Sequence, residues 1–243
     1  MEELPKEKEK IEVRGTILYS SKEKIDFAVK KRFIFGFWHI AVIGNGEKIA
    51  SEQLERIKKS GVYDASDEIF VVVLGEKIPD FISKDKKLNV FYHKNVRLFE
   101  YPSLCFMKHL SKEIDFDCWY IHTKGATSEI KDGPGAANWR KYMEHFIIDK
   151  WEICLDFLNN YGAVGVEFNR YNYHDYFAGN FWWAKSEYIR TLPEIKNFDL
   201  SDRFGAEMWI GWVEWSSLKM KNLFSVGQEK LMNIKEKEYE NKI

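Results

Sequence analysis

The 243-residue sequence has few cysteines, only five prolines and no long apolar run. Its three cysteines, Cys105, Cys118 and Cys154, have no paired spacing, which argues against a disulfide-rich secreted domain and favours buried thiols in a reducing compartment. No stretch approaches the ~18 to 20 apolar residues of a membrane span, and no signal-peptide core is found near the start. The sequence therefore predicts a cytoplasmic protein without a transmembrane segment.

An excess of basic charge is also absent. The chain has 37 Lys and Arg against 38 Asp and Glu, a formal net charge of −1. Proteins that bind duplex nucleic acid normally carry a basic excess, so we expect no nucleic-acid partner. Aromatic residues, in contrast, make up 16% of the chain. Most such side chains fill cores, although their faces also stack on bases and on the apolar faces of sugars.

Apolar runs that end in glycine predict an α/β fold. A strand at Phe33–Ile43 is followed by an amphipathic helix at Ile49–Ser60 and a strand at Glu68–Leu74, which together make a βαβ unit. Further strands are expected at Leu88–Phe91, Val96–Phe99, Cys118–Ile121, Ala163–Phe168 and Phe181–Ala184, and helices at Tyr101–Ile114 and Asn138–Asn159. We predict one α/β domain with a central, mainly parallel sheet flanked by helices at residues 33–217. An N-terminal extension of unknown role (1–32) and a charged C-terminal tail, helical or loose (218–243), complete the chain.

Residues 118–125, Cys-Trp-Tyr-Ile-His-Thr-Lys-Gly, are the most informative stretch. Four apolar residues typical of a strand buried on both faces are followed at once by His122, Thr123, Lys124 and Gly125. In open α/β sheets, ligands bind just beyond the carboxyl ends of the strands. Lys124 brings a positive charge, and Gly125 permits a sharp turn with close backbone approach. The stretch therefore predicts a site for an anionic ligand such as a diphosphate.

Five blocks in the same order resemble a family of nucleotide-sugar glycosyltransferases found in bacterial surface-polysaccharide loci and large DNA viruses. They are FWHIAVIGNGEKIASEQLERIKKSGVYDASDEIFVVVLG (37–75), WYIHTKGAT (119–127), NWRKYMEHF (138–146), FAGNFWWAKSEYIRTLP (177–193) and AEMWIGW (206–212). The resemblance implies a GT-A-like fold, a nucleotide-sugar donor as co-substrate, and a glycan or glycoconjugate acceptor bound on a side built from the later loops.

Glycosyl transfer needs a grip on the nucleotide, neutralisation of the departing diphosphate, and a group that activates the acceptor hydroxyl. The resemblance implies that Asn45 contacts the nucleotide, although Gly44-Asn45-Gly46 also fits a plain turn. GT-A enzymes usually place an Asp-x-Asp that binds Mn²⁺ or Mg²⁺ at the end of a central strand, where this chain has His122, Thr123 and Lys124. Lys124 would then supply the charge of the metal. His122 would bind phosphate, ligate a metal or have only a structural role.

The chain does contain one Asp-x-Asp, Asp115-Phe116-Asp117, but it precedes the strand. That order puts it at the opposite, amino-terminal edge of the sheet, where we expect a turn or a helix end. Two carboxylates alone are a weak metal signal. A divalent metal therefore stays possible, without an Asp-x-Asp at the expected strand end to support it.

Several later residues are candidate binding residues. Trp139 and Arg140 are expected to begin a helix after the loop at 126–137, where Arg140 opposes the helix dipole and either grips phosphate or is exposed. Alternation on a strand sends Trp182 and Trp183 to opposite faces, and one of them could form a platform for the sugar or acceptor. The remaining candidates in this part of the chain are His174 and Asn180.

Glu207 is the candidate catalytic base. It lies in an apolar, aromatic segment, and it follows the sugar-contacting block, where inverting GT-A enzymes often place their acidic base. In that role it takes the proton of the acceptor hydroxyl as the oxygen attacks the anomeric carbon. The alternatives are a buried Glu paired with Arg203 and, in a retaining enzyme, a group that orients the donor.

The sequence thus predicts a glycosyltransferase that moves a hexosyl or deoxyhexosyl group to a hydroxyl in surface-polysaccharide synthesis. A non-catalytic carbohydrate-binding domain that keeps the fold is the alternative. A flavodoxin-like nucleotide binder comes third, because Gly44-Asn45-Gly46 is too short for a dinucleotide fingerprint.

Overall fold

The structure is a computed structural model that describes residues 8–13, 16–23, 32–127, 135–171, 174–199, 201–213 and 219–243. Its centre is a nine-stranded sheet with the strand order β1-β2-β5-β4-β3-β6-β10-β7-β11. The strands are β1 (Lys8–Val13), β2 (Thr16–Glu23), β3 (Phe33–Val42), β4 (Glu68–Gly75), β5 (Leu88–His93), β6 (Phe116–His122), β7 (Ala163–Gly165), β10 (Trp182–Lys185) and β11 (Met220–Asn222). A separate two-stranded sheet contains β8 (Phe168–Tyr171) and β9 (His174–Phe177).

Four adjacent strands, β5, β4, β3 and β6, run parallel in the middle of the large sheet. β10 is antiparallel to both of its neighbours, β6 and β7, and β11 is parallel to β7. The chain moves outward from β3 to β5 and then returns to place β6 on the other side of β3. Such a reversal of strand order is a topological switch point, and ligands of open α/β sheets bind beyond the carboxyl ends of the strands there.

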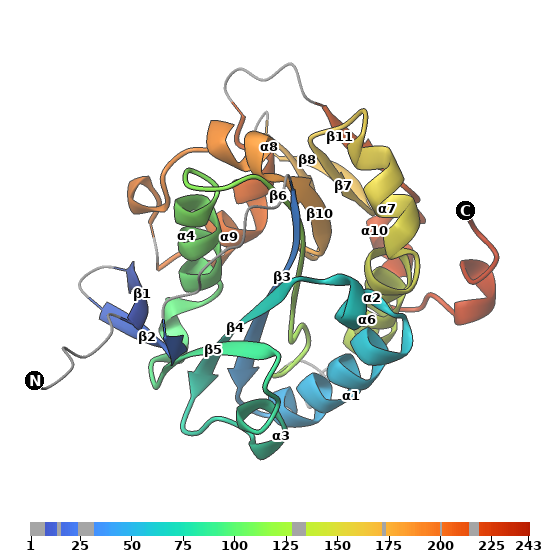
Figure 1. Cartoon of the computed structure of the whole chain (residues 1–243). Coiled ribbons are helices and arrows are strands. Elements are labelled where there is room, and N and C mark those ends of the chain that lie inside the picture. The colour runs from blue at the N-terminus through green and yellow to red at the C-terminus, as the bar shows by residue number, and fades with distance from the viewer. Residues whose placement is uncertain are drawn as a thin grey trace, which may run out of the picture.

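Helices cover both faces of the sheet. They are α1 (Gly46–Lys59), α2 (Val62–Ala65), α3 (Asp80–Ser83), α4 (Tyr101–Leu110), α6 (Gly135–Glu144), α7 (Trp151–Leu158), α8 (Ser186–Thr191), α9 (Arg203–Met208) and α10 (Gln228–Leu231). Figure 1 shows α1, α6 and α7 on one side of the sheet and α4 and α9 on the other. Strand alternation feeds two separate cores: Phe35 and Phe37 of β3 point into one, and Trp38 and Ile40 into the other. The predicted α/β class, with a mainly parallel sheet and flanking helices, is confirmed.

The βαβ unit of β3, α1 and β4 lies where the sequence predicts it. The strand predicted at Val96–Phe99 is wrong. Val96–Leu98 is a 3₁₀ helix (η1), and the Asn95 side chain caps it by accepting a hydrogen bond from Arg97 N. Three more 3₁₀ turns are η3 (Ile195–Asn197), η4 (Trp209–Gly211) and η5 (Glu236–Glu238).

The long helix predicted at Asn138–Asn159 is also divided. It begins at Gly135, and a π-helical turn, η2 (His145–Asp149), separates α6 from α7. Phe146, Ile147 and Ile148 are all buried. The π turn, whose hydrogen bonds join residues five apart, interrupts the regular α-helical ladder at this point.

Residues outside the predicted central domain join the fold. β2 extends the sheet through a bridge between Ser20 and Phe91 of β5. At the other end of the chain, β11 pairs with β7, and Leu231, Ile234 and Tyr239 are buried in the core that α6 covers. The C-terminal segment therefore contributes a strand and core side chains, and its α10 and η5 turns agree with the helical alternative of the prediction rather than with a loose tail.

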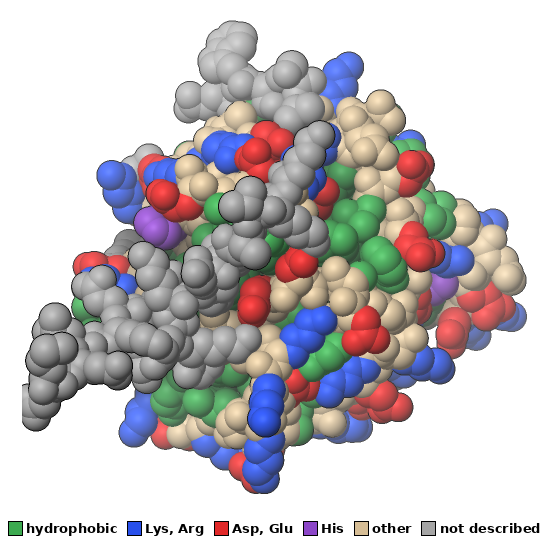
Figure 2. All heavy atoms as spheres, viewed as in Figure 1, with side chains coloured by type: hydrophobic (Ala, Val, Ile, Leu, Met, Phe, Trp, Pro, Cys, Tyr) green, Lys and Arg blue, Asp and Glu red, His purple; other side chains and the backbone are tan. Residues whose placement is uncertain are grey.

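The outer surface carries charges of both signs. Figure 2 shows basic and acidic side chains interspersed over the face that it presents, in keeping with the net charge of −1. Within the described ranges, every helix is too short or too polar to cross a membrane.

Candidate functional site

The carboxyl ends of β3 and β6 are joined by direct hydrogen bonds. Thr123 N donates to His39 O over 3.1 Å, and Ala41 N donates to Thr123 Oγ1 over 2.9 Å. Further along, Asn45 N donates to Ala126 O over 2.8 Å. Thr123 is buried, and its hydroxyl prolongs the strand pairing. Its role is therefore structural, and it brings the turn after β3 against the turn after β6 at the switch point.

Asn45 and Gly125 shape the two turns. Asn45 occupies the position before α1, and its side chain makes no capping hydrogen bond to the helix. The Asn45 side chain therefore does not cap the helix, although Asn often has that role at this position. Gly125 has a φ of 89°, a left-handed conformation that favours glycine. The position of both residues agrees with the predicted ligand-binding edge.

His122 ends β6, and its imidazole lies between a backbone carbonyl and a carboxylate. Nε2 lies 3.0 Å from Gly179 O, and Nδ1 lies 3.5 Å from Glu100 Oε1. Burial lowers the pKa of His122 to about 3, and the charge of Lys124 adds to the effect. The ring is therefore neutral at pH 7, and Nε2–H donates to the Gly179 carbonyl. The neutral ring carries no charge, and its one N–H is already bonded to Gly179 O, so His122 has no donor left for a phosphate.

Glu100 is a residue of this end that the sequence reasoning missed. Its Oε2 accepts hydrogen bonds from Asn180 Nδ2 over 2.6 Å and from the Tyr120 hydroxyl over 3.2 Å, and its Oε1 faces His122. Glu100 directly precedes α4, where the helix dipole favours an acid. An acid before the predicted helix was visible in the sequence. Its contact with a residue 80 positions away was not.

The turn at Gly179 and Asn180 connects β6 to α9. Both residues have left-handed φ values, 91° and 60°. The Gly179 carbonyl accepts from His122, and the Gly179 N–H donates to Glu207 Oε1 over 2.5 Å. The φ of 91° at Gly179 is one that residues with a side chain rarely adopt, so glycine is favoured there. Contacts therefore run without a break from the end of β6 to Glu207.

Lys124 lies at the same end of β6. Its Nζ is 3.8 Å from the centre of the Trp139 ring, a cation–π contact. Burial lowers the pKa of Lys124, although the carboxylates of Glu207 and Glu100 oppose this. Its ammonium forms no ion pair or hydrogen bond with the part of the chain that the structure describes. A partly buried cation that lies on an aromatic ring, without an ion-pair partner among the described residues, is suited to an anionic ligand.

Arg140 is not placed to bind a ligand. It is 2% exposed, and its guanidinium donates to Lys124 O over 3.0 Å and pairs with Glu52 and Glu144. Since α6 begins at Gly135, Arg140 lies inside the helix and not at its start. Both roles proposed from the sequence, a phosphate grip and an exposed side chain, are therefore wrong. Arg140 instead fixes the backbone of Lys124.

Trp182 and Trp183 are fully buried. Trp182 Nε1 donates to Asn180 Oδ1 over 2.7 Å in one core, and Trp183 Nε1 donates to Ile147 O over 2.7 Å in the other. Their predicted alternation is confirmed, but neither forms a platform, because β10 is an inner strand covered on both faces. Asn180 is likewise buried and holds Trp182 and Glu100 in place.

A cavity of about 570 Å³ opens beside Lys124. The loop after β6, α6, the β8–β9 hairpin and α9 all contribute to its wall, with Lys124, Trp139, Tyr171, Arg203, Phe204 and Glu207 among the lining residues. Pockets of this size hold small-molecule ligands, and aromatic walls with a few polar groups are typical of them. Lys124, Trp139 and Glu207, predicted from three different blocks, thus meet at one cavity.

Glu207 is fixed at one carboxylate oxygen. It lies on α9, whose first turn is capped by Asp202 accepting from Phe204 N over 2.9 Å. Oε1 accepts from Gly179 N, and among the described residues Oε2 has no hydrogen-bond partner. The Arg203 guanidinium lies over the Phe204 ring at 5.1 Å and forms no ion pair with Glu207 within the described ranges. One oxygen is thus held, and the other is available at the cavity.

His174 has a packing role. Its ring stacks on Trp212 with centroids 4.3 Å apart and an interplanar angle of 27°. This contact joins the start of β9 to the segment that follows η4. His174 supports the hairpin wall of the cavity without being among the residues that line it.

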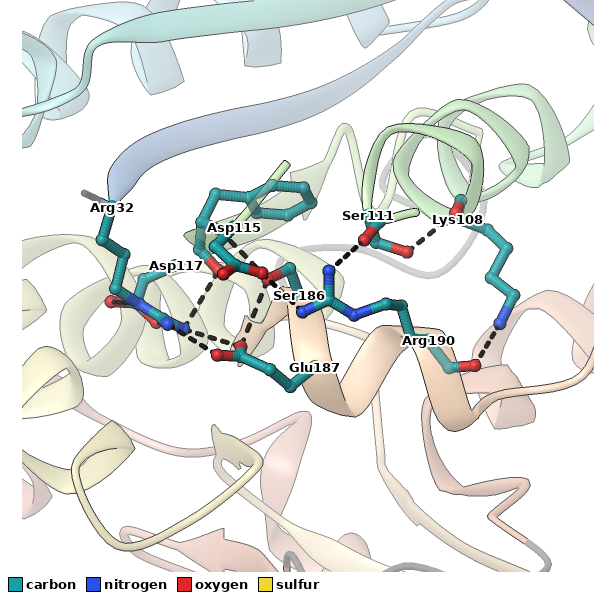
Figure 3. A network of polar contacts seen from close by, with 9 residues as sticks. Arg32, Lys108, Ser111, Asp115, Asp117, Ser186, Glu187 and Arg190 are labelled. Carbon is teal, nitrogen blue, oxygen red and sulfur yellow. Dashed lines mark hydrogen bonds and ion pairs between the residues drawn. The ribbon is translucent and has the colours of Figure 1, made fainter. Parts of the chain in front are cut away.

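The Asp-x-Asp lies at the opposite end of β6, as predicted. Asp117 accepts two hydrogen bonds from Arg32, of 2.7 and 2.8 Å, and Arg32 also pairs with Glu187 at 2.8 Å. Asp115 pairs with Arg190 at 2.5 Å. Figure 3 shows this network around the start of α8. The strand begins earlier than predicted, so Asp117 is its second residue.

Comparison with known families identifies the family of this chain. Residues 41–223, about three quarters of the chain, match a family described as a domain of unknown function (DUF8361). The chain belongs to this family. No curated protein matches it. The matched range includes the ends of β3 and β6, the hairpin and α9, and therefore most of the cavity wall.

Proposed function

We propose that this protein is a nucleotide-sugar-dependent glycosyltransferase that transfers a sugar to a hydroxyl of a glycan or glycoconjugate. The observation that carries the proposal is the meeting of Lys124 and Glu207 at one cavity beside the switch point of the sheet. One is a cation without a carboxylate partner among the described residues, and the other is a carboxylate with one oxygen available. These are the two charges that glycosyl transfer requires.

The arrangement of the sheet supports a GT-A-like fold. Counted from β3, the strands lie in the order 3-2-1-4-6-5-7, and only the sixth of them, β10, runs in the opposite direction. A mainly parallel sheet of this kind agrees with the GT-A-like fold that the resemblance implies. In GT-A proteins the first strand and its turn typically hold the nucleotide; here these are β3 and the turn with Asn45, next to β6 and the turn with Lys124.

Lys124 stabilises the diphosphate leaving group. As the bond between the anomeric carbon and the diphosphate oxygen breaks, the electron pair stays on the diphosphate, and the ammonium neutralises the added charge. Trp139 holds the ammonium from one side, and Arg140 fixes the Lys124 carbonyl from the other. The described residues contain no group of three or more His, Cys, Asp or Glu side chains that could hold a metal ion. Nucleotide binding measured in Mn²⁺ and in EDTA decides whether the site also uses a metal.

Glu207 acts on the acceptor. Its Oε2 accepts the proton of the acceptor hydroxyl while the hydroxyl oxygen forms the new bond to the anomeric carbon. The Gly179 N–H holds Oε1 and so orients the carboxylate. Attack from the face opposite the diphosphate inverts the anomeric centre. Surface-polysaccharide synthesis is the setting that the resemblance implies, and the cytoplasm is the location that the composition of the sequence predicts.

Turnover of nucleotide sugars tests the proposal. The purified chain is incubated with UDP-, GDP-, CDP- and dTDP-sugars, with and without mixed oligosaccharide acceptors, and released nucleoside diphosphate is measured. We expect one donor class to release diphosphate faster when an acceptor is present, and the Glu207→Gln variant to lose that increase. Binding of glycans with no release and no nucleotide binding would instead support the non-catalytic carbohydrate-binding domain.

A further inference from the structure

Two exposed aromatic side chains lie at the mouth of the cavity. Tyr171 is 56% exposed and Phe204 is 55% exposed, and both line the cavity. The other strongly exposed aromatic side chains among the described residues, Tyr19 and Phe168, do not line it. Exposed aromatic surface that gathers at one cavity marks a binding surface, whereas single exposed rings are ordinary.

The hairpin side of this mouth is held firmly. The β8–β9 register places Tyr171 opposite His174, and Tyr176 follows two residues later on the same face. His174 stacks on Trp212, and a Cβ on Gly211 would collide with the backbone of β9. Because these contacts press β9 against the segment after α9, the face with Tyr171 and Tyr176 keeps its position at the cavity.

Charged side chains line the cavity together with these aromatic rings. Asp202, Arg203 and Glu207 line the same cavity, and the Arg203 guanidinium lies over Phe204. A pyranose ring has an apolar C–H face and a rim of hydroxyl groups. Aromatic faces pack against the first, while carboxylates and a guanidinium form hydrogen bonds with the second.

We propose that Tyr171 and Phe204 form the acceptor subsite, an aromatic rim on which sugar rings of the acceptor glycan stack with the reacting hydroxyl turned towards Glu207. This inference rests on the proposed function and adds the position of the acceptor. It moves the sugar platform from Trp182 and Trp183, which are buried, to rings that are exposed.

A nucleotide base is the other flat ligand that would stack on such rings. It carries a diphosphate, and beside the rim the positive charge of Arg203 is offset by the carboxylates of Asp202 and Glu207, so the rim offers that ligand no net attraction. Hydroxyl groups, in contrast, donate hydrogen bonds to carboxylates. The charges therefore favour a sugar at the rim and leave the diphosphate to Lys124.

Saturation-transfer NMR tests the rim. The probes are methyl glycosides of glucose, galactose, N-acetylglucosamine and rhamnose, with uridine and adenosine as competitors. We expect at least one glycoside to bind through the C–H protons of one face. Tyr171→Ala and Phe204→Ala should each weaken that binding by about tenfold. Tyr19→Ala, which removes an equally exposed ring on β2, should leave it unchanged within about twofold.

Three results would overturn the inference: no glycoside signal with the wild-type protein, equal binding in the rim variants, or displacement of the glycoside by a nucleoside. Nucleoside diphosphate binding by the wild-type protein is scored separately. If the protein binds a nucleotide but the rim variants bind the glycosides normally, the acceptor subsite is rejected and the proposed function stands. If glycoside binding depends on the rim but no nucleotide binds, the subsite stands and the transferase function is rejected.

Discussion

The two ends of β6 differ in whether their charged side chains are paired. At the amino end, Asp117 and Glu187 share Arg32, so each of these charges has a partner of opposite sign (Figure 3). At the carboxyl end, Lys124 rests on an aromatic ring, with no carboxylate paired to it among the described residues. Paired charges stabilise a structure, whereas an unpaired, desolvated charge is costly and is found where a ligand completes it.

The pKa values follow the same division. Hydrogen bonds from Arg32 lower the pKa of Glu187 to about 2, which keeps its charge at any ordinary pH. Burial lowers the pKa of Lys124 and lowers that of His122 to about 3. Pairing thus favours the charged form at one end, and burial disfavours it at the other. The carboxyl end keeps a cation at a cost in stability, as functional sites often do.

The largest effect is expected from Glu207→Gln at the carboxyl end. Loss of a general base lowers the transfer rate by roughly 10²- to 10⁴-fold. Nucleotide binding should persist, because the amide oxygen still accepts from Gly179 N. Glu187→Gln at the amino end is the matched control and should keep the wild-type rate. Wild-type turnover in Glu207→Gln would remove this residue from the mechanism.

Removal of the unpaired cation comes next. Lys124→Met should weaken nucleoside diphosphate binding by about 100-fold, since a hydrogen bond to a charged group contributes roughly 1.5–3 kcal/mol. The free energy of unfolding should stay equal or rise by about 1 kcal/mol, because a desolvated charge is lost. Calorimetry and urea unfolding measure the two effects.

Lys221→Met is the control for this substitution, since the Lys221 ammonium also lies over an aromatic ring, 4.8 Å from the centre of Phe157, but does not line the cavity. Unchanged nucleotide affinity in Lys124→Met, or an equal loss in Lys221→Met, would contradict the assignment of the site.

The buried histidines predict acid sensitivity. Burial lowers the pKa of His39 to about 4 and that of His122 to about 3, from 6.5. The unfolded chain binds these protons near pH 6.5 and the folded chain does not, so their contribution is full above pH 6.5 and falls away below it. At pH 4.5 each histidine lowers the free energy of unfolding by roughly 2–3 kcal/mol relative to pH 7.5.

Urea unfolding at the two pH values checks this, with His122→Gln as the variant. The variant should lose less stability on acidification than the wild-type protein, because one of the two protonation sites is gone. An identical decrease in both proteins would show that His122 is not buried in a neutral form.

The smallest effect is expected at the amino end. Asp117→Asn removes the paired charge of Arg32 in a partly exposed ion pair, with the two side chains 31% and 16% exposed. The free energy of unfolding should fall by about 1 kcal/mol, and nucleotide binding should not change. Urea unfolding and calorimetry again separate the two. Loss of nucleotide binding here would mean that the Asp-x-Asp belongs to the site after all.

The sequence predicted the parallel part of the sheet well, because its strands are buried on both faces and are continuous apolar runs. β3 and β4 match their predicted ranges within about one residue. Prediction from the sequence failed where a local contact decides the structure. Val96–Leu98 has strand-like composition, but the Asn95 cap makes it a 3₁₀ turn, and a π turn after Glu144 divides a helix whose apolar spacing is continuous in the sequence.

The site was predictable only in part for a related reason. Lys124 and Glu207 stand out locally, one after a strand and one in an apolar segment, and both line the cavity. Arg140 and Trp182 looked equally suitable, but which side of a helix or strand a residue presents to the core depends on distant partners. Glu100 and the exposed rings of Tyr171 and Phe204 became visible only once distant segments were brought together.

A thermal-shift experiment on the wild-type protein and Lys124→Met tests the central claim most directly. Nucleoside diphosphates and nucleotide sugars are added at about 100 times their Kd, each with Mn²⁺ and with EDTA. A bound ligand then stabilises by roughly 2.7 kcal/mol, a shift of a few degrees in Tm. We predict a shift for one nucleotide class that persists in EDTA and disappears in Lys124→Met. No shift with any nucleotide, or the same shift in both proteins, would contradict a diphosphate site at the carboxyl end of β6.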